Sequence, residues 1–209
     1  TYGQREMILH GESPIEGGDY VRLGATLASF RRDGFGTNVR NGEENYDKDL
    51  LGFRSKMEIR PRESMSLVLS YDLTEDNSNV KSGNRRIATD GLPLLSNVYD
   101  TEAGITQSGH PLNDNTVLSR GLSASFRWDL SSYWRLSAIT ASRGDRVKSA
   151  IDFISQPSEH FDTHVLYDND QFSQELRFTF SSDSLYALFG IYYLDAKALS
   201  AFEVDGGWR

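Results

Sequence analysis

The residues best suited to hold a metal ion form one short stretch rich in histidine and carboxylate. It reads Glu159-His160-Phe161-Asp162-Thr163-His164. In an extended backbone successive side chains point to opposite faces, so His160, Asp162 and His164 would share one side. Imidazole and carboxylate groups are ligands for transition metals. The alternative is a polar loop in solvent. We assign no metal here, because the sequence shows no further residues that would orient such ligands.

A second oxygen-rich stretch, Asp72–Asn79 with the sequence DLTEDNSN, offers ligands of the kind that Ca²⁺ prefers. Its spacing does not follow an EF-hand loop, so a polar loop base is the alternative and no metal is assigned. Basic residues occur at Asn84-Arg85-Arg86, at Arg143 and at Arg146. Arginine can bind a carboxylate or a lipopolysaccharide phosphate through two parallel hydrogen bonds. Ordinary surface charge is the alternative interpretation.

Enzyme motifs are missing from the sequence. The chain contains no G-x-S-x-G elbow, no phosphate-binding P-loop, no H-E-x-x-H and no G-x-G-x-x-G. Its Ser, His and Asp residues are scattered through loop-rich regions without a recognisable arrangement. We therefore expect that the protein is not an enzyme and that it needs no cofactor.

Composition limits the remaining classes of function. The chain has 209 residues, a net charge of −8 and no cysteine. The lack of cysteine excludes a disulfide scaffold and thiolate metal sites. The acidic balance argues against a nucleic-acid partner, which requires a basic surface. No run of about 18 apolar residues exists, so the sequence predicts no transmembrane helix.

The dominant pattern in the chain is alternation of apolar and polar residues with a period of two. In Met65–Leu73 and in Leu122–Leu130 every second residue is apolar. This period is typical of β-strands with one apolar and one polar face. The same reading predicts eight strands, at 3–11, 20–31, 48–60, 65–75, 119–129, 134–144, 171–180 and 185–198.

The links between these strands alternate in length. Tight turns are predicted at 61–64, 131–133 and 181–184, with a longer turn at 11–19. Long polar links are predicted at 33–47, 76–118 and 145–170. In bacterial outer-membrane barrels the short turns face the periplasm and the long loops face outward. The sequence therefore predicts an all-β fold: an antiparallel transmembrane β-barrel wall segment of about eight strands, with short periplasmic turns and long extracellular loops.

Each strand of such a wall has a lipid face and a lumen face. The predicted lipid face includes Val21, Leu23, Ala25, Leu27, Leu51, Phe53, Met57, Ile59, Phe172, Leu176, Phe178, Phe180, Leu185, Ala187, Phe189, Ile191 and Tyr193. The polar residues predicted to face the lumen are Arg22, Arg54, Lys56, Glu58, Asp72, Arg127, Asp129, Arg135, Glu175 and Arg177.

Aromatic residues fall near the predicted strand ends. Trp128, Trp134 and Phe180 lie beside the short turns, and Tyr71, Phe172 and Tyr193 lie toward the long links. Such a distribution is expected of the two aromatic girdles at the membrane interfaces. The alternative is the general preference of aromatic residues for strands.

Several segments, taken in order, resemble TonB-dependent outer-membrane receptors. The segment QFSQELR at 171–177 resembles a strand that recurs in that family. The segments LASFRRDGFG at 27–36 and ENYDKD at 44–49 resemble an early barrel hairpin. LSAITASR at 136–143 and FGIYYLD at 189–195 are also similar to family segments, so the resemblance spans most of the chain.

The resemblance implies a 22-stranded barrel with an N-terminal plug inside it. Eight strands in 209 residues require roughly 26 residues each, so 22 strands would need nearly three times this length. We therefore expect residues 1–209 to be part of one β-barrel domain, without a plug domain or TonB-box segment in this chain.

By resemblance, the function would be energised uptake of a scarce nutrient such as a ferric siderophore across the bacterial outer membrane. The implied partners are outer-membrane lipid, a small-molecule ligand (a metal chelate, a vitamin or a glycan) and the TonB complex, reached through a plug absent from this chain. Two alternatives remain open: a complete eight-stranded outer-membrane barrel acting as an adhesin or structural protein, and a soluble β-sandwich binding module.

Overall fold

The computed structural model describes residues 1–15, 20–79, 83–88, 91, 93–102, 115–156 and 161–205. Ten strands form within them: β1 (Arg5–Pro14), β2 (Val21–Arg32), β3 (Gly36–Thr37), β4 (Glu44–Asn45), β5 (Lys48–Arg62), β6 (Met65–Asp76), β7 (Thr116–Asp129), β8 (Trp134–Asp152), β9 (Asp162–Ser181) and β10 (Tyr186–Asp205). None of the described residues builds a helix long and apolar enough to cross a membrane.

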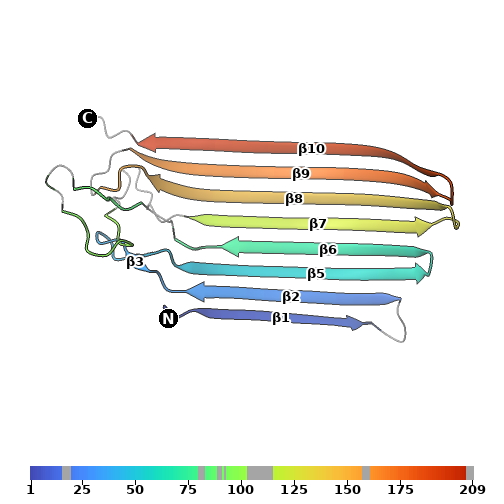
Figure 1. Cartoon of the computed structure of the whole chain (residues 1–209), viewed down its shortest axis with the longest axis horizontal. Coiled ribbons are helices and arrows are strands. Elements are labelled where there is room, and N and C mark those ends of the chain that lie inside the picture. The colour runs from blue at the N-terminus through green and yellow to red at the C-terminus, as the bar shows by residue number, and fades with distance from the viewer. Residues whose placement is uncertain are drawn as a thin grey trace.

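Eight of the strands form one antiparallel sheet. Its order is β1-β2-β5-β6-β7-β8-β9-β10, so each long strand pairs with the next long strand in the chain. Figure 1 shows these strands side by side, with both chain ends at the same end of the sheet. The eight strands predicted from the alternating pattern are thereby confirmed, including the first.

The links are unequal at the two ends of the sheet, as predicted. Residues 63–64 join β5 to β6, residues 130–133 join β7 to β8, and residues 182–185 join β9 to β10. All three lie at one end of the sheet (Figure 1). The turn predicted at 11–19 lies partly outside the described residues, because positions 16–19 are not described.

The link predicted at 145–170 is wrong. β8 continues to Asp152 and β9 begins at Asp162, so most of this segment is paired strand. The prediction ended each strand where the apolar alternation stops. Beyond that point polar and apolar residues no longer alternate, and the pairing continues through the backbone ladder and through side chains such as Arg146 and Asp168.

The link at 33–47 also contains unpredicted structure. β3 and β4 form a two-stranded sheet within it. Asn38 makes an isolated bridge to Thr101, which joins this link to the one between β6 and β7. Strands of two residues carry too little alternation to be recognised in a sequence.

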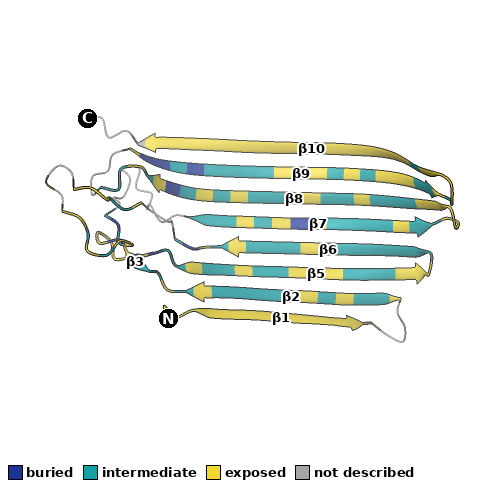
Figure 2. Ribbon diagram, in the orientation of Figure 1, coloured by how far each residue is buried: buried dark blue, intermediate teal, exposed yellow. Residues whose placement is uncertain are grey.

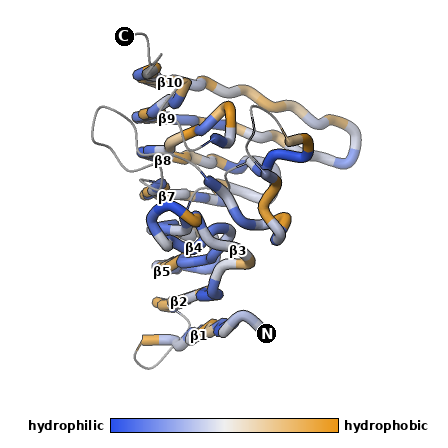
Figure 3. Tube along the Cα trace, turned by 90° about the vertical axis from the view of Figure 1, so that its left-hand side faces the viewer, coloured by the Kyte–Doolittle hydropathy of each residue, from blue (hydrophilic) through white to orange (hydrophobic). Residues whose placement is uncertain are grey.

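The large sheet is a single layer. The buried apolar residues among the described ones are Ala150 and Val165, and both lie near the long links rather than in the middle of the sheet. Figure 2 shows that β1 is exposed throughout and β10 along nearly all of its length, and that most of the dark, buried segments lie near the long links, with one more in the middle of β7. Figure 3 looks along the strands, whose ends stack in one column with β3 and β4 to one side.

This single layer decides between the predicted architectures. The described residues contain no second sheet packed face to face against the first, which a β-sandwich requires. The sheet is also open, with β1 and β10 at opposite edges, so the described chain does not form a closed eight-stranded barrel.

Candidate functional site

The pairing register divides the sheet into two chemically different faces. Residues directly opposite each other in neighbouring strands point to the same side of a sheet. Leu69 pairs with Met57 and with Ala124, and this side is here called the apolar face. Ser70 pairs with Lys56 and with Ser123, and this side is called the polar face.

A band of large apolar residues covers the apolar face. Leu122 in the central strand β7 is 60% exposed, and Ile191 in β10 is 73% exposed. Exposure of large side chains in the middle of a sheet shows that no described segment covers this face. Contiguous exposed apolar surface of this kind marks a site of contact with a membrane or another protein.

Aromatic pairs lie at both ends of this apolar band. At the short-turn end, the ring centroids of Trp134 and Phe180 are 5.0 Å apart. Toward the long links, Phe172 and Tyr193 are 6.4 Å apart, and Phe53 and Tyr71 are 6.2 Å apart. Phe172 and Phe180 are eight residues apart in β9, which is about 27 Å along a strand. A strand tilted by about 40° would therefore give a band about 20 Å high, close to the thickness of a barrel's apolar belt.

The edge of the apolar band nearest the long links runs obliquely across the strands. Leu27 in β2 lies in the same cross-strand row as Phe53 and Leu73. Followed onward, that row contains Arg120 in β7 and Lys197 in β10. The band thus ends closer to the short turns in β10 than in β2. Such an offset is expected when strands are inclined to a planar boundary, as in barrel walls.

The ten residues predicted to face a lumen all lie on the polar face. By register this holds for Arg22, Arg54, Lys56, Glu58, Asp72, Arg127, Asp129, Arg135, Glu175 and Arg177. Six of them are basic and four are acidic, whereas the whole chain has a net charge of −8. The polar face therefore carries an excess of positive charge among these residues. Whether it lines a lumen stays a prediction.

Ion pairs on the polar face form both within strands and between neighbouring strands. Asp129 contacts both Arg127 at 2.9 Å and Arg135 at 2.5 Å, and Arg177 contacts Glu175. These pairs are partly exposed, so each contributes little to stability. Their consequence is a hydrated surface of fixed charges.

One ion pair spans a whole strand. Asp72 in β6 accepts a hydrogen bond from Arg143 in β8 at 3.2 Å, and both side chains pass over Gly121 in β7. A Cβ atom at position 121 would lie 2.8 Å from the Asp72 carboxylate. Glycine is therefore required there for the pair to form. From the sequence, Arg143 is expected near a loop. It lies an even number of residues from Arg135 in the same strand, however, and this spacing places both side chains on the same face.

Two hollows open on the polar face. One, of about 310 Å³, is lined by His10, Glu12, Gly24, Arg54 and Lys56, among others. The other, of about 600 Å³, lies at the short-turn end and includes Tyr20, Arg60, Arg127 and Asp129. These mixed charged linings fit polar solutes or polar protein surfaces better than apolar ligands.

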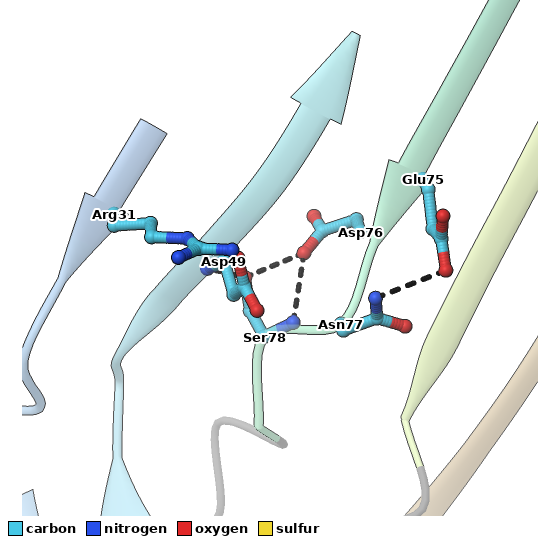
Figure 4. A network of polar contacts seen from close by, with 6 residues as sticks. All are labelled: Arg31, Asp49, Glu75, Asp76, Asn77 and Ser78. Carbon is cyan, nitrogen blue, oxygen red and sulfur yellow. Dashed lines mark hydrogen bonds and ion pairs between the residues drawn. The ribbon is translucent and has the colours of Figure 1, made fainter. Parts of the chain in front are cut away.

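The oxygen-rich stretch Asp72–Asn79 is occupied by its own hydrogen bonds. Asp76 accepts hydrogen bonds from the backbone and hydroxyl of Ser78, and the Ser78 hydroxyl also accepts one from the Asp49 backbone at 3.0 Å. Figure 4 shows Glu75 and Asp76 on different sides of the strand, with Asn77 bonded to Glu75 at 3.1 Å. The stretch thus ties β6 to β5 at the base of the long links.

A third hollow lies beneath the long links. It measures about 650 Å³ and is lined by Arg32, Asp47, Lys48, Asp76 and Asp152, together with neighbouring residues. Asp47 accepts a hydrogen bond from the Asn79 backbone at 2.7 Å. Burial raises the pKa of Asp47 above its usual value, and nearby Glu44 and Asp49 add to the rise, while the Asn79 hydrogen bond opposes it. The sequence does not indicate this site, because its residues come from segments that lie far apart in the chain.

Aromatic side chains hold the long links together above this hollow. Phe35 packs edge-on against Tyr2 at 4.9 Å, and Tyr99 contacts both Phe35 and Tyr46. The guanidinium of Arg32 lies 4.0 Å from the centre of the Phe35 ring. The contact between Phe35 and Tyr99 joins residues that are more than sixty positions apart in the sequence.

The remaining predicted sites have different outcomes. Glu159 and His160 lie outside the described residues, so the metal stretch at 159–164 is described only from Phe161 onward. Within the described ranges, no group of three or more histidine, cysteine or acidic residues could hold a metal ion. Arg85 pairs with Glu102 within the links, and Arg146 pairs with Asp168 on the apolar-face side.

Comparisons with known proteins point to one architecture. No protein-family model matches the chain, and no curated protein matches it. Among solved structures, the crystal structure of the ferric yersiniabactin uptake receptor FyuA from Yersinia pestis is similar, with a TM-score of 0.62 and 16% sequence identity. The similarity covers 96% of this chain and 30% of that receptor. The shared property at this identity is the fold.

Proposed function

We propose that this chain forms part of the wall of an outer-membrane β-barrel receptor that takes up a scarce small-molecule nutrient. The single observation that carries the proposal is the apolar band on one face of the sheet. It is bounded by aromatic pairs at both ends, runs obliquely to the strands, and backs onto a charged face. Lipid contact on one side and water on the other account for all three features.

The open edges agree with this assignment. Unpaired N–H and C=O groups along β1 and β10 cannot remain exposed within a bilayer, so further strands would have to complete the wall. The receptor that shares this fold is itself much longer than the aligned region. We propose that the present sheet corresponds to one portion of such a wall.

The nature of transport follows from two resemblances. The segments at 171–177 and 27–36 resemble TonB-dependent receptors, and the structurally similar protein is named for uptake of a ferric siderophore. We propose energised uptake driven by the TonB complex, with a ferric siderophore as the leading ligand class and a vitamin or glycan as others. A transport role leaves no catalytic residue to assign.

Topology and uptake test this proposal together. An epitope inserted after Arg86, in a long link, should bind antibody on intact cells, whereas one inserted after Ser132 should require permeabilised cells. A deletion strain should fail to grow on one nutrient among a ferric siderophore, cobalamin and an oligosaccharide, each supplied as the sole source. Dissipating the proton gradient should abolish that uptake. Labelling at Ser132 on intact cells, or unchanged growth on every nutrient, would contradict the proposal.

A further inference from the structure

We propose that the lipid-facing wall binds a phosphate-bearing lipid headgroup through Arg120 and Lys197. These residues lie on the apolar-face side, in the row where the apolar band ends in β7 and β10. The inference rests on the proposed function, since only insertion in a membrane brings lipid to this face.

A hollow at the edge of the band provides the space. It measures about 380 Å³ and is lined by Leu118, Arg120, Gly144, Asp170, Lys197 and Leu199, among others. A Cβ atom at position 144 would lie 3.1 Å from the Asp170 carboxylate and 3.4 Å from Nε of Arg120. Because Gly144 has no side chain, its backbone in β8 forms the floor of the hollow between strands β7 and β9.

Two of the positive charges in this hollow, those of Arg120 and Lys197, are not neutralised by an ion pair within the described residues. Arg146 makes two hydrogen bonds to Asp168, and Arg31 bonds Asp49 at 3.1 Å. Arg120 and Lys197, by contrast, make no hydrogen bond or ion pair within the described residues. Asp170 is the one carboxylate that shares their row, so two cations flank a single negative charge. The lining also includes Asp168, which pairs with Arg146, and Asp145, whose carboxylate lies 4.0 Å from Nε of Arg143. With these pairs set aside, Arg120 and Lys197 face Asp170 with one positive charge in excess.

Its position selects a lipid over a free anion. The hollow lies between the row of Arg120 and Lys197 and the next row toward the long links. On its other side the apolar band begins, where Phe172 in β9 and Tyr193 in β10 lie one and two rows closer to the short turns. A lipid can place its phosphate against Arg120 and Lys197 while its hydrocarbon lies against the band. Phosphate groups occupy this depth because they lie just outside the hydrocarbon boundary.

Lipid binding to the protein purified from outer membranes tests the inference. Diphosphoryl lipid A is titrated into the detergent-solubilised protein and bound copies are counted by native mass spectrometry. Arg120→Gln with Lys197→Gln should weaken binding about thirtyfold, and Lys197→Gln alone about fivefold, because a basic side chain near an anionic lipid surface contributes about 1 kcal/mol. The matched control, Arg54→Gln with Lys56→Gln, removes two cations from the polar face and should leave binding unchanged.

The outcomes separate this inference from the proposed function. Each variant is first checked for heat-modifiable gel mobility, which reports membrane assembly. If all variants assemble and the two double variants bind lipid equally, the headgroup site is wrong and the proposed membrane wall is unaffected. If an equal concentration of inorganic phosphate displaces the lipid, the site binds free anions and the lipid assignment is wrong. If the unmodified protein shows no heat-modifiable mobility, the membrane wall itself is wrong, and the headgroup site falls with it.

Discussion

At the scale of single residues, glycine decides where charged side chains can cross a strand. Gly121 lets Asp72 reach Arg143 on the polar face, and Gly144 leaves room between Arg120 and Asp170 on the other face. In both places the glycine lies in one cross-strand row between a basic and an acidic residue, and the two residues beside Gly121 are in contact. That contact therefore depends on a position that carries no charge itself.

Replacing Gly121 by alanine should destabilise the sheet by about 1 kcal/mol or less, the usual contribution of a partly exposed ion pair. The new Cβ would lie 2.8 Å from the Asp72 carboxylate and force it away from Arg143. The temperature of the heat-modifiable mobility shift measures the effect. Gly24→Ala is the control, because a Cβ at that polar-face position meets nothing closer than 3.8 Å. Equal shifts for both variants would show that Gly121 has no special role.

The long links should become less stable as pH rises, because the Asp47 carboxyl group ionises. Its pKa is raised in the folded state, so its contribution to stability is fully present below the unfolded pKa and is lost as pH rises through the folded one. Asp47→Asn keeps an acceptor for the Asn79 backbone but removes the charge, and should slow amide exchange at Asn79 at neutral pH. Asp47→Ala also removes the acceptor and should cost about 1 kcal/mol. Faster exchange in Asp47→Asn than in the unmodified protein would contradict this account.

At the scale of strands, the alternation of side chains along each strand decides whether a residue lies on the apolar or the polar face. A strand of the proposed wall needs only about 9–11 residues to cross a membrane, yet β9 has 20. The halves of β8 and β9 nearest the long links carry polar side chains on both faces. These two halves pair with each other, and Arg146 of β8 contacts Asp168 of β9. We infer that these extensions stand above the apolar band and support the long links.

Leu69→Arg should block membrane assembly, whereas Ser70→Arg should be mild. The two neighbours in β6 point to opposite faces, Leu69 into the apolar band and Ser70 onto the polar face. An arginine on the lipid face at mid-membrane costs about 2–4 kcal/mol. Phe126→Arg, also in the band, should behave like Leu69→Arg. Heat-modifiable gel mobility reads the result, and equal damage from Leu69→Arg and Ser70→Arg would show that the faces are reversed.

At the scale of the whole molecule, the sheet is one open layer. Its two edges, β1 and β10, are exposed and lie at opposite ends of the strand order. Long unpaired edges favour association with further strands. Whether the proposed wall is completed therefore depends on which strands pair with these two edges.

Paired cysteines at Met7 and Ile191 should not form an intramolecular disulfide, because these positions lie in opposite edge strands. Cysteines at Met7 and Ser29 should form one readily, since these residues are direct partners in β1 and β2. Disulfide formation needs Cα atoms within about 7 Å. Gel mobility with and without reductant distinguishes the two results. Efficient linkage of Met7 to Ile191 would mean that the sheet closes on itself as an eight-stranded barrel.

The sequence by itself determined which residues share a face. Period-two alternation is local, and it was sufficient to identify eight strands, their order and the common side of all ten predicted polar residues. It failed where alternation stops, at 145–170, because pairing there depends on the backbone ladder and on cross-strand partners such as Arg146 and Asp168. A local pattern cannot identify a strand in which polar and apolar residues do not alternate.

Only the tertiary structure decided how the strands align with one another. Register brings Leu27 and Lys197 into one row, which makes the apolar band oblique, and it places Gly121 beneath the Asp72–Arg143 pair. It also gathers Arg32, Asp47 and Asp152 around one hollow and leaves the sheet open at β1 and β10. These features depend on contacts between residues far apart in the chain, and such contacts are fixed by strand alignment rather than by local composition.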